Sequence, residues 1–149
     1  MVKVLIKKLD PAVKLPEYKT IGSSGMDLVA FIKEPIKVKP KKSYLVPTGL
    51  AVAFLDDYEI QIRPRSGLAA KNNISILNTP GTIDSDYRGE IKIIIYNHGS
   101  DDFDISNGDR VAQMVLSPVI KIELEEVNDL PETIRWEGGF GSTGKWIQN

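Results

Sequence analysis

The stretch "NTPGTIDSDYRGEIKIIIYN", residues 78–97, decides the fold, because it ends in an almost continuous run of isoleucine. A short apolar run rich in β-branched residues predicts a β-strand. Asp84, Ser85, Asp86 and Tyr87 stand before this strand, after a Pro-Gly turn. Such residues are common in turns, because Asp and Ser side chains bond the local backbone. Two carboxylates and a tyrosine at the mouth of an apolar strand also fit a binding or catalytic site.

Most other apolar segments of the chain repeat every two residues, which is the period of a strand with one buried face. These alternating runs lie at residues 2–7, 50–54, 58–63 and 120–125. Turn signals separate the runs, at Asp10-Pro11, Pro40, Asp56-Asp57, Pro80-Gly81, residues 97–100 and Asn107-Gly108. Many short strands with regular turns predict an all-β domain, which is a sandwich, jelly roll or barrel. One short helix is expected around "SGLAAK", residues 66–71, with Ser66 able to cap its first turn.

Length and composition limit the classes of function. A chain of 149 residues is long enough for one domain with a hydrophobic core. The net charge is -1 with 26% charged residues of both signs, so we expect neither nucleic-acid nor membrane binding. The absence of cysteine removes disulfides, thiolate nucleophiles and cysteine-based zinc sites. The N-terminal "MVKVLIKKLDP" is unlike a signal peptide or a membrane span, and the cytoplasm is the expected location.

The C-terminal end has a different composition from the rest of the chain. From Glu137 on, "EGGFGSTGKWIQN" is too rich in glycine to hold a fold alone. We therefore expect one β domain over residues 1–136 and a flexible arm over residues 137–149. A plain linker, however, has no need of Phe140 or of Arg135.

Four further segments repeat one chemical theme. They are "SGMDLVA", residues 24–30, "RPRSGLAAK", residues 63–71, "GDRVAQMV", residues 108–115, and "RWEGGFGSTGK", residues 135–145. Taken singly, Asp27, Arg65 and Gln113 are more simply explained as a turn carboxylate, a surface charge and an edge-strand residue. Together, a helix start with Ser and Gly, a Gly-Ser-Thr-Gly run and arginines suit phosphate, and an exposed Phe140 suits stacking on a flat ring. The theme indicates a ligand with several phosphates and a base.

With "GTIDSDYRGEI", residues 81–91, these segments resemble, in order and spacing, the five motifs of the homotrimeric dUTPases. The resemblance covers residues 22–145, nearly the whole chain. It implies a dUTPase-like fold of the β-clip type, a jelly-roll-like or distorted β-barrel. It also implies hydrolysis of dUTP to dUMP and pyrophosphate, by attack of water on the α-phosphorus with Mg²⁺ bound to the triphosphate. This reaction keeps uracil out of DNA and supplies dUMP for thymidylate synthesis, and in the family three chains assemble each site.

We number these five segments as blocks in chain order. The resemblance assigns roles to residues of the third block, "GTIDSDYRGEI". Asp84 is similar to the general base that holds and deprotonates the attacking water, and a dry place at the mouth of an apolar strand suits a base. Tyr87 is similar to the floor under the deoxyribose, which leaves no room for a 2′-hydroxyl. The hairpin between residues 78 and 92 resembles the uracil slot, with substrate contacts from Asn78, Thr82, Ile83 and Lys92. Fixed backbone groups there would match uracil, whereas cytosine would leave buried groups unpaired.

The other blocks resemble contacts to phosphate and metal. The phosphate contacts of the body would come from Arg65, Ser66, Gly67 and Gln113. Asp27 is similar to an aspartate that meets Mg²⁺ through water, the metal being held mainly by the triphosphate. In the tail, Phe140 would cover the uracil and Gly141 would contact the substrate, while the outer phosphates would be held by Arg135, Ser142 and Thr143.

The resemblance leaves two points open, which are the effect of Trp136 and the relative placement of Asp84 and Tyr87. Trp136 stands where the family commonly has glycine after the arginine of its last motif, so we expect it to slow closure of the tail. Strict alternation would put Asp84 and Tyr87 on opposite faces of a strand. Both can line one pocket only if the chain bends within "SDYRG", where Gly89 allows a bend.

Three alternatives remain at this point. A dCTP deaminase shares the fold, but it needs a glutamate where this chain has Ile94, and "SG" replaces the "SS" of its second motif. A non-catalytic dUTP-binding sensor would need a damaged site, whereas Asp84, Ser66 and Gln113 are all present. A carbohydrate- or capsid-type jelly roll would leave "FGSTG" unexplained.

Overall fold

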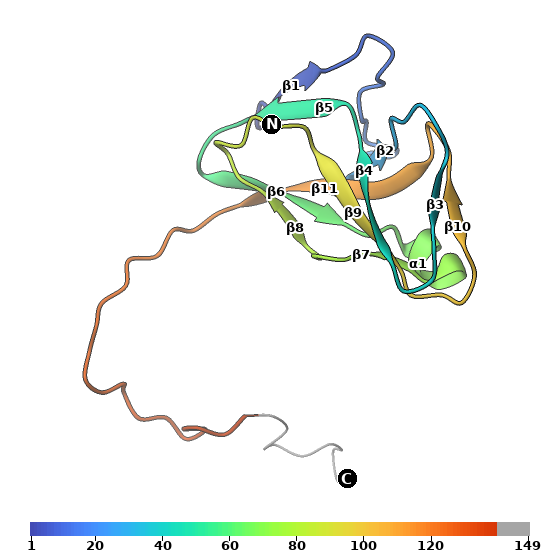
Figure 1. Ribbon diagram of the computed structural model, residues 1–149. Coiled ribbons are helices and arrows are strands. Elements are labelled where there is room, and N and C mark those ends of the chain that lie inside the picture. The colour runs from blue at the N-terminus through green and yellow to red at the C-terminus, as the bar shows by residue number, and fades with distance from the viewer. Residues whose placement is uncertain (140–149) are drawn as a thin grey trace.

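The computed structural model describes residues 1–139, and within that range it confirms the expected all-β architecture (Figure 1). Short strands follow one another along this part of the chain, interrupted by one short helix. The elements are β1 (Leu5–Lys8), β2 (Met26–Val29), β3 (Ile36–Val38), β4 (Ser43–Pro47), β5 (Leu50–Ala53), β6 (Tyr58–Arg63), α1 (Ser66–Asn72), β7 (Ile74–Ile76), β8 (Gly81–Ile83), β9 (Lys92–Asn97), β10 (Phe103–Ile105) and β11 (Arg110–Pro118). No helix in the described range is long and apolar enough to cross a membrane.

The strands form two larger antiparallel sheets and two separate strand pairs. One sheet has the order β2-β11-β6-β8, and the other has the order β4-β9-β7. β1 pairs with β5, and β10 pairs with β3. Strands that are distant in the sequence are therefore neighbours in space, as β2 and β11 are. This pairing brings the first and the fourth sequence blocks side by side.

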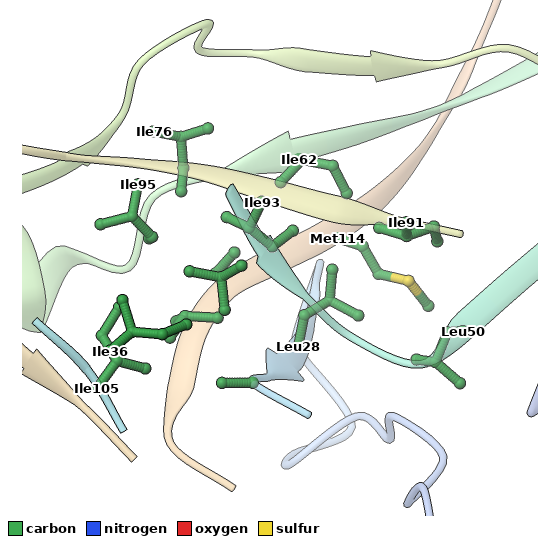
Figure 2. Packing of buried hydrophobic residues seen from close by; sticks show 14 of the residues in the cluster. Leu28, Ile36, Leu50, Ile62, Ile76, Ile91, Ile93, Ile95, Ile105 and Met114 are labelled. Carbon is green, nitrogen blue, oxygen red and sulfur yellow. The ribbon is translucent and has the colours of Figure 1, made fainter. Parts of the chain in front are cut away.

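The hydrophobic core joins side chains from both larger sheets, as Figure 2 shows. Leu28 from β2, Met114 from β11 and Ile93 from β9 all belong to it. Burial alternates along β9, because Ile93 and Ile95 have no exposed surface whereas Ile94 between them is partly exposed. Each fully buried side chain of this size contributes roughly 1.5–3 kcal/mol. The isoleucine strand thus anchors the end of the segment that carries the polar cluster.

Three of the four alternating runs are confirmed as strands, namely those in β1, β5 and β6. The fourth prediction, a strand over residues 120–125, is wrong, because β11 ends at Pro118 and residues 119–135 contain no strand. Ile120, Ile122 and Leu124 are 90%, 79% and 86% exposed. A strand needs a neighbour to complete its hydrogen bonds, and this segment runs away from the sheets (Figure 1).

Candidate active site

Three charged side chains from separate parts of the sequence meet at one edge of the four-stranded sheet. Asp27 lies in β2, Arg65 stands directly before α1, and Arg110 begins β11. Arg65 Nε donates to Asp27 Oδ1 at 2.9 Å, and Arg110 Nη1 donates to Asp27 Oδ2 at 3.1 Å. Arg65 Nη1 also donates to the backbone carbonyl oxygen of Arg110 at 3.2 Å. We call Asp27, Arg65 and Arg110 the arginine cluster.

The arginine cluster suits an anionic ligand. Its two positive charges outnumber its one negative charge, and guanidinium groups bind phosphate oxygens in a bidentate manner. The side chains of Asp27 and Arg65 are only 20% and 24% exposed, so salt screens their interaction less than that of a surface pair. Each guanidinium group has five N–H donors, and the contacts within the cluster leave several of them for a ligand.

Arg110 is a site residue that the sequence patterns did not single out. It lies within the fourth block, three positions before Gln113, and that membership is the signal that could have found it. Its approach to Asp27 depends on the pairing of β11 with β2, which is irregular between Arg110 and Ala112. The pairing, and not the local sequence, therefore completes the cluster.

Gln113 joins the same site from β11. It lies opposite Asp27 in β2 and opposite Arg63 in β6. Its Nε2 donates to the carbonyl oxygen of Pro64 at 3.0 Å, which directs the side chain toward the segment before α1. Gly25 leaves room for this arrangement, since a Cβ at position 25 would lie 2.7 Å from Gln113 Oε1. The first, second and fourth sequence blocks therefore meet in one place.

The start of α1 contributes backbone groups and an open surface. Ser66 is the first residue of the helix, and Arg65 before it has extended backbone angles and makes no side-chain capping bond. The expectation that Ser66 caps the first turn is therefore wrong, because the N-cap position falls one residue earlier. The N–H groups of an uncapped first turn are left for solvent or a ligand. Gly67 follows in the same turn, and the space beside it is open.

A cavity of about 340 Å³ opens beside the arginine cluster. Its walls come from α1, β10 and β11 and the loop between these strands, through Arg65, Leu68, Phe103, Asp104, Ile105, Asp109, Arg110 and Val111. The volume lies in the range of small-molecule sites. A ligand there would meet apolar side chains such as Leu68 and Val111, the two guanidinium groups, and the carboxylates of Asp104 and Asp109.

The resemblance implied a hairpin between residues 78 and 92, but the two strands of this segment do not pair with each other. β8 pairs with β6 in one sheet, whereas β9 pairs with β4 and β7 in the other. The two limbs separate because the isoleucines of β9 are needed in the core of the second sheet. Within the described chain β8 is then an edge strand, so backbone groups on its outer side lack a strand partner. Thr82 and Ile83 lie on this edge strand, Asn78 precedes it, and Lys92 begins β9.

The chain bends directly after β8, as the sequence requires if Asp84 and Tyr87 are to line one pocket. Tyr87 N donates to the carbonyl oxygen of Asp84 at 3.1 Å, which closes a turn. The Tyr87 hydroxyl donates to the carbonyl oxygen of Glu90 at 3.0 Å, and the ring lies over Gly89. A Cβ on Gly89 would lie 2.3 Å from the hydroxyl oxygen, so any larger residue at this position would displace the ring. The bend is confirmed, and the shared pocket stays a prediction.

The arginine cluster and Asp84 lie at opposite edges of the same sheet. Asp27 is on edge strand β2 and Asp84 follows edge strand β8, with β11 and β6 between them. Through β11, Asp27 aligns with Arg63 of β6. Ile83 of β8 pairs with Ile60, which is three residues from Arg63 along β6. Strand spacings of about 4.8 Å and a rise of about 3.3 Å per residue place Asp27 and Asp84 roughly 20 Å apart. A single chain therefore brings together Asp27, Arg65, Ser66, Gly67 and Gln113 and leaves Asp84 remote.

The last described residues lie away from the sheets (Figure 1). Arg135 Nε donates to the carbonyl oxygen of Gly138 at 2.7 Å and contacts none of the arginine cluster within residues 1–139. Trp136 is 58% exposed and has φ 45°, a backbone region that side-chain-bearing residues rarely adopt. The tail residues Phe140, Gly141, Ser142 and Thr143 lie outside the described residues, and their expected roles stay predictions.

Comparisons with known proteins point to one family. The family model described as dUTPase matches residues 12–144. A protein of Rickettsia bellii (strain OSU 85-389), named deoxyuridine 5'-triphosphate nucleotidohydrolase, is 55% identical over 146 residues, which are 97% of each chain. A Rickettsia felis protein of the same name is 53% identical over 95% of this chain and 97% of its own. The solved structure of Staphylococcus bacteriophage 80alpha dUTPase with dUPNHPP has a TM-score of 0.85 at 25% identity, covering 95% of this chain and 98% of that one.

Proposed function

The chain belongs to the dUTPase family, and from that membership we propose that it hydrolyses dUTP to dUMP and pyrophosphate. The observation that carries the proposal is the meeting of three family blocks around two arginines, Ser66, Gly67 and Gln113. The proposed reaction keeps uracil out of DNA and supplies dUMP for thymidylate synthesis. We expect it to take place in the cytoplasm.

The reaction we propose is attack of water on the α-phosphorus. The water oxygen bonds to phosphorus, the bond from phosphorus to the α,β-bridging oxygen breaks, and pyrophosphate leaves. Asp84 takes the proton of the water as general base, and its exposed carboxylate at the end of β8 is accessible to a ligand. Arg65 and Arg110 stabilise the charge on the phosphates, which is the main requirement of phosphoryl transfer.

Recognition of the nucleoside is assigned to the 78–92 segment. The outer edge of β8 offers fixed N–H and C=O groups, which suit the edge of uracil and disfavour cytosine. Tyr87 presents an exposed aromatic face beside this edge, on which the deoxyribose would lie. Ile94 occupies the position where a deaminase needs an acid, so the chain offers no group there for work on a cytosine amine.

We further propose that copies of the chain share each site as a homotrimer. One water must touch both Asp84 and the α-phosphorus of a triphosphate held by the arginine cluster, yet Asp27 and Asp84 of one chain are roughly 20 Å apart. The cluster of one copy placed against β8 of another removes this separation. The exposed apolar side chains of Ile120, Ile122 and Leu124 support association, because a neighbouring copy would cover them. A third copy would supply Arg135 and the tail.

The proposed cofactor is Mg²⁺, and the described residues fit a metal that is held mainly by the triphosphate. Within residues 1–139, no group of three Asp, Glu or His side chains could hold a cation by itself. Mg²⁺ usually keeps several waters and binds one or two carboxylates together with substrate phosphates. Asp27 fits contact through a water, because each of its oxygens accepts one guanidinium bond and keeps a further lone pair. When bound, the metal would neutralise charge on the phosphates.

A pyrophosphate-release assay with Mg²⁺ across dUTP, dCTP, dTTP and UTP tests the proposal. We expect release from dUTP in strong preference to the other three nucleotides. Binding of dUTP without release would establish the non-catalytic sensor instead. Release of ammonia from dCTP would establish the deaminase.

A further inference from the structure

A set of hydrogen bonds fastens the end of the 78–92 segment to the turn between β4 and β5. We propose that this set positions the ring of Tyr87 and thereby determines how strongly the enzyme distinguishes deoxyribose from ribose. Glu90 is its positioning residue, since it bonds the turn through its side chain and Tyr87 through its backbone. The inference rests on the proposed function, in which Tyr87 lies under the sugar.

The fastening consists of bonds to the two turn residues, Thr48 and Gly49, and to Leu50 at the start of β5, and we call it the Glu90 strap. Gly49 N donates to Glu90 Oε1 at 2.8 Å, and Thr48 Oγ1 donates to the carbonyl oxygen of Ile91 at 2.6 Å. Ile91 N donates to the carbonyl oxygen of Leu50 at 2.8 Å. Thr48 and Ile91 have no exposed surface, so water does not compete for their bonds. Residues 90 and 91 therefore keep a constant place relative to the turn.

The turn that receives the strap is itself held in place. Gly49 has φ +69°, which glycine adopts without strain. A Cβ at this position would lie 2.5 Å from Val13 Cγ2 and 3.0 Å from the ring of Phe31. The carbonyl oxygen of Gly49 also accepts a bond from Leu9 N at 2.8 Å. A turn packed and bonded on these sides is a rigid reference for the strap.

The strap reaches Tyr87 through the backbone of Glu90. The Tyr87 hydroxyl donates to the carbonyl oxygen of Glu90, and the ring covers Gly89 with no room to spare. The side chain is still 44% exposed, so a ligand can lie on its free surface. Deoxyribose and ribose differ by one oxygen atom, so a ring that shifts by about 1 Å would begin to admit the 2′-hydroxyl.

Glu90 acts in the strap through an acceptor oxygen. Its side chain is 22% exposed, and the Oε1 atom carries the bond from Gly49 N. Its Oε2 lies 3.7 Å from Lys92 Nζ, which is a longer and weaker contact. Glutamine keeps the acceptor and loses the charge, whereas alanine loses both. The two substitutions therefore separate the strap from the charge.

The test compares the specificity ratio, kcat/KM for dUTP over kcat/KM for UTP, in Glu90→Ala, Glu90→Gln and the wild type. We expect Glu90→Ala to lower the ratio about ten-fold, because one hydrogen bond to a charged acceptor contributes about that factor. Most of the change should come from a higher kcat/KM for UTP. Glu90→Gln should restore the ratio to within about two-fold of the wild type, because the acceptor remains. The matched control is Glu34→Ala, since Glu34 lines the same cavity of about 580 Å³ as Glu90. Its ratio should equal that of the wild type.

An unchanged ratio in a folded Glu90→Ala protein would overturn the inference, because a merely structural loss slows both substrates alike. If circular dichroism shows that Glu90→Ala does not fold, Tyr87→Phe decides, since it removes only the hydroxyl bond to Glu90. A lowered ratio in Tyr87→Phe supports the inference, and a wild-type ratio overturns it. Failure of the proposed function is distinct, because the wild type itself would then release no pyrophosphate from dUTP.

Discussion

Replacing Asp27 with asparagine tests what holds the arginine cluster together. The Asp27 carboxylate accepts bonds from Arg65 at 2.9 Å and Arg110 at 3.1 Å, and it is only 20% exposed. Asparagine has nearly the same shape but no charge. Its amide nitrogen would place a donor against one of the two guanidinium groups, so at least one bond is lost. The two arginines would then repel each other without compensation.

The expected cost follows from burial and geometry. Hydrogen bonds to charged groups contribute about 1.5–3 kcal/mol, whereas an exposed ion pair contributes about 0–1 kcal/mol. The side chains of the cluster are partly buried, so the cost of losing one of its bonds lies within the limits that these two ranges set. We therefore expect Asp27→Asn to lower the free energy of unfolding by about 2 kcal/mol. For a chain of this size, that loss lowers the melting temperature by roughly 4–8 °C. The same displacement of the arginines should raise the KM for dUTP about ten-fold.

Two assays check this prediction. The first is thermal unfolding followed by circular dichroism at fixed protein concentration, because association also stabilises. The second is the KM for dUTP at increasing Mg²⁺ concentration. The matched control is Asp56→Asn, which removes an exposed ion pair with Lys121 and should leave the melting temperature unchanged. A wild-type melting temperature in Asp27→Asn, or a KM that Mg²⁺ restores completely, would refute the reasoning.

Three further changes test the proposed roles of the remaining residues. Asp84→Asn should lower turnover about 10²–10⁴-fold, because an amide cannot accept the proton of the attacking water, and near-normal pyrophosphate release would remove Asp84 from this role. Truncation after Arg135 should lower turnover more than uracil selectivity, because the 78–92 segment would carry selectivity. A truncated chain that accepts dCTP or dTTP freely would contradict this. Trp136→Gly should speed closure of the tail and raise turnover, since glycine adopts φ 45° without strain, and unchanged kcat and KM would count against the idea.

The strands could be predicted where a local rule applies. A half-buried sheet needs an apolar residue at every second position, so alternation found β5 and β6. The same rule failed at residues 120–125, because alternation marks an apolar face without saying what covers it. The resemblance implied a hairpin over residues 78–92, whereas the core divides its two limbs between two sheets. The sequence predicted Ser66 as the N-cap, one residue later than the observed N-cap, because helix boundaries are uncertain by a residue or two.

The site could be predicted only in part. Asp27, Arg65 and Gln113 lie in sequence blocks with a recognisable spacing, and the structure places them together. Arg110 was missed because its partner Asp27 lies 83 positions earlier in the chain. The Glu90 strap was missed for the same reason, since Gly49 and Glu90 are 41 positions apart. Contacts of this range arise from strand pairing.

By itself, the sequence determined the all-β class, the family blocks and therefore the chemistry to expect, because these depend on residue type and local spacing. Only the tertiary structure decided that Asp27 is held between two arginines and that Tyr87 is fixed over Gly89. It also placed Asp84 at the far edge of the sheet from the arginine cluster. The physical reason is that side-chain chemistry is a local property, whereas the distance between remote residues is set by which strands bury their apolar faces together.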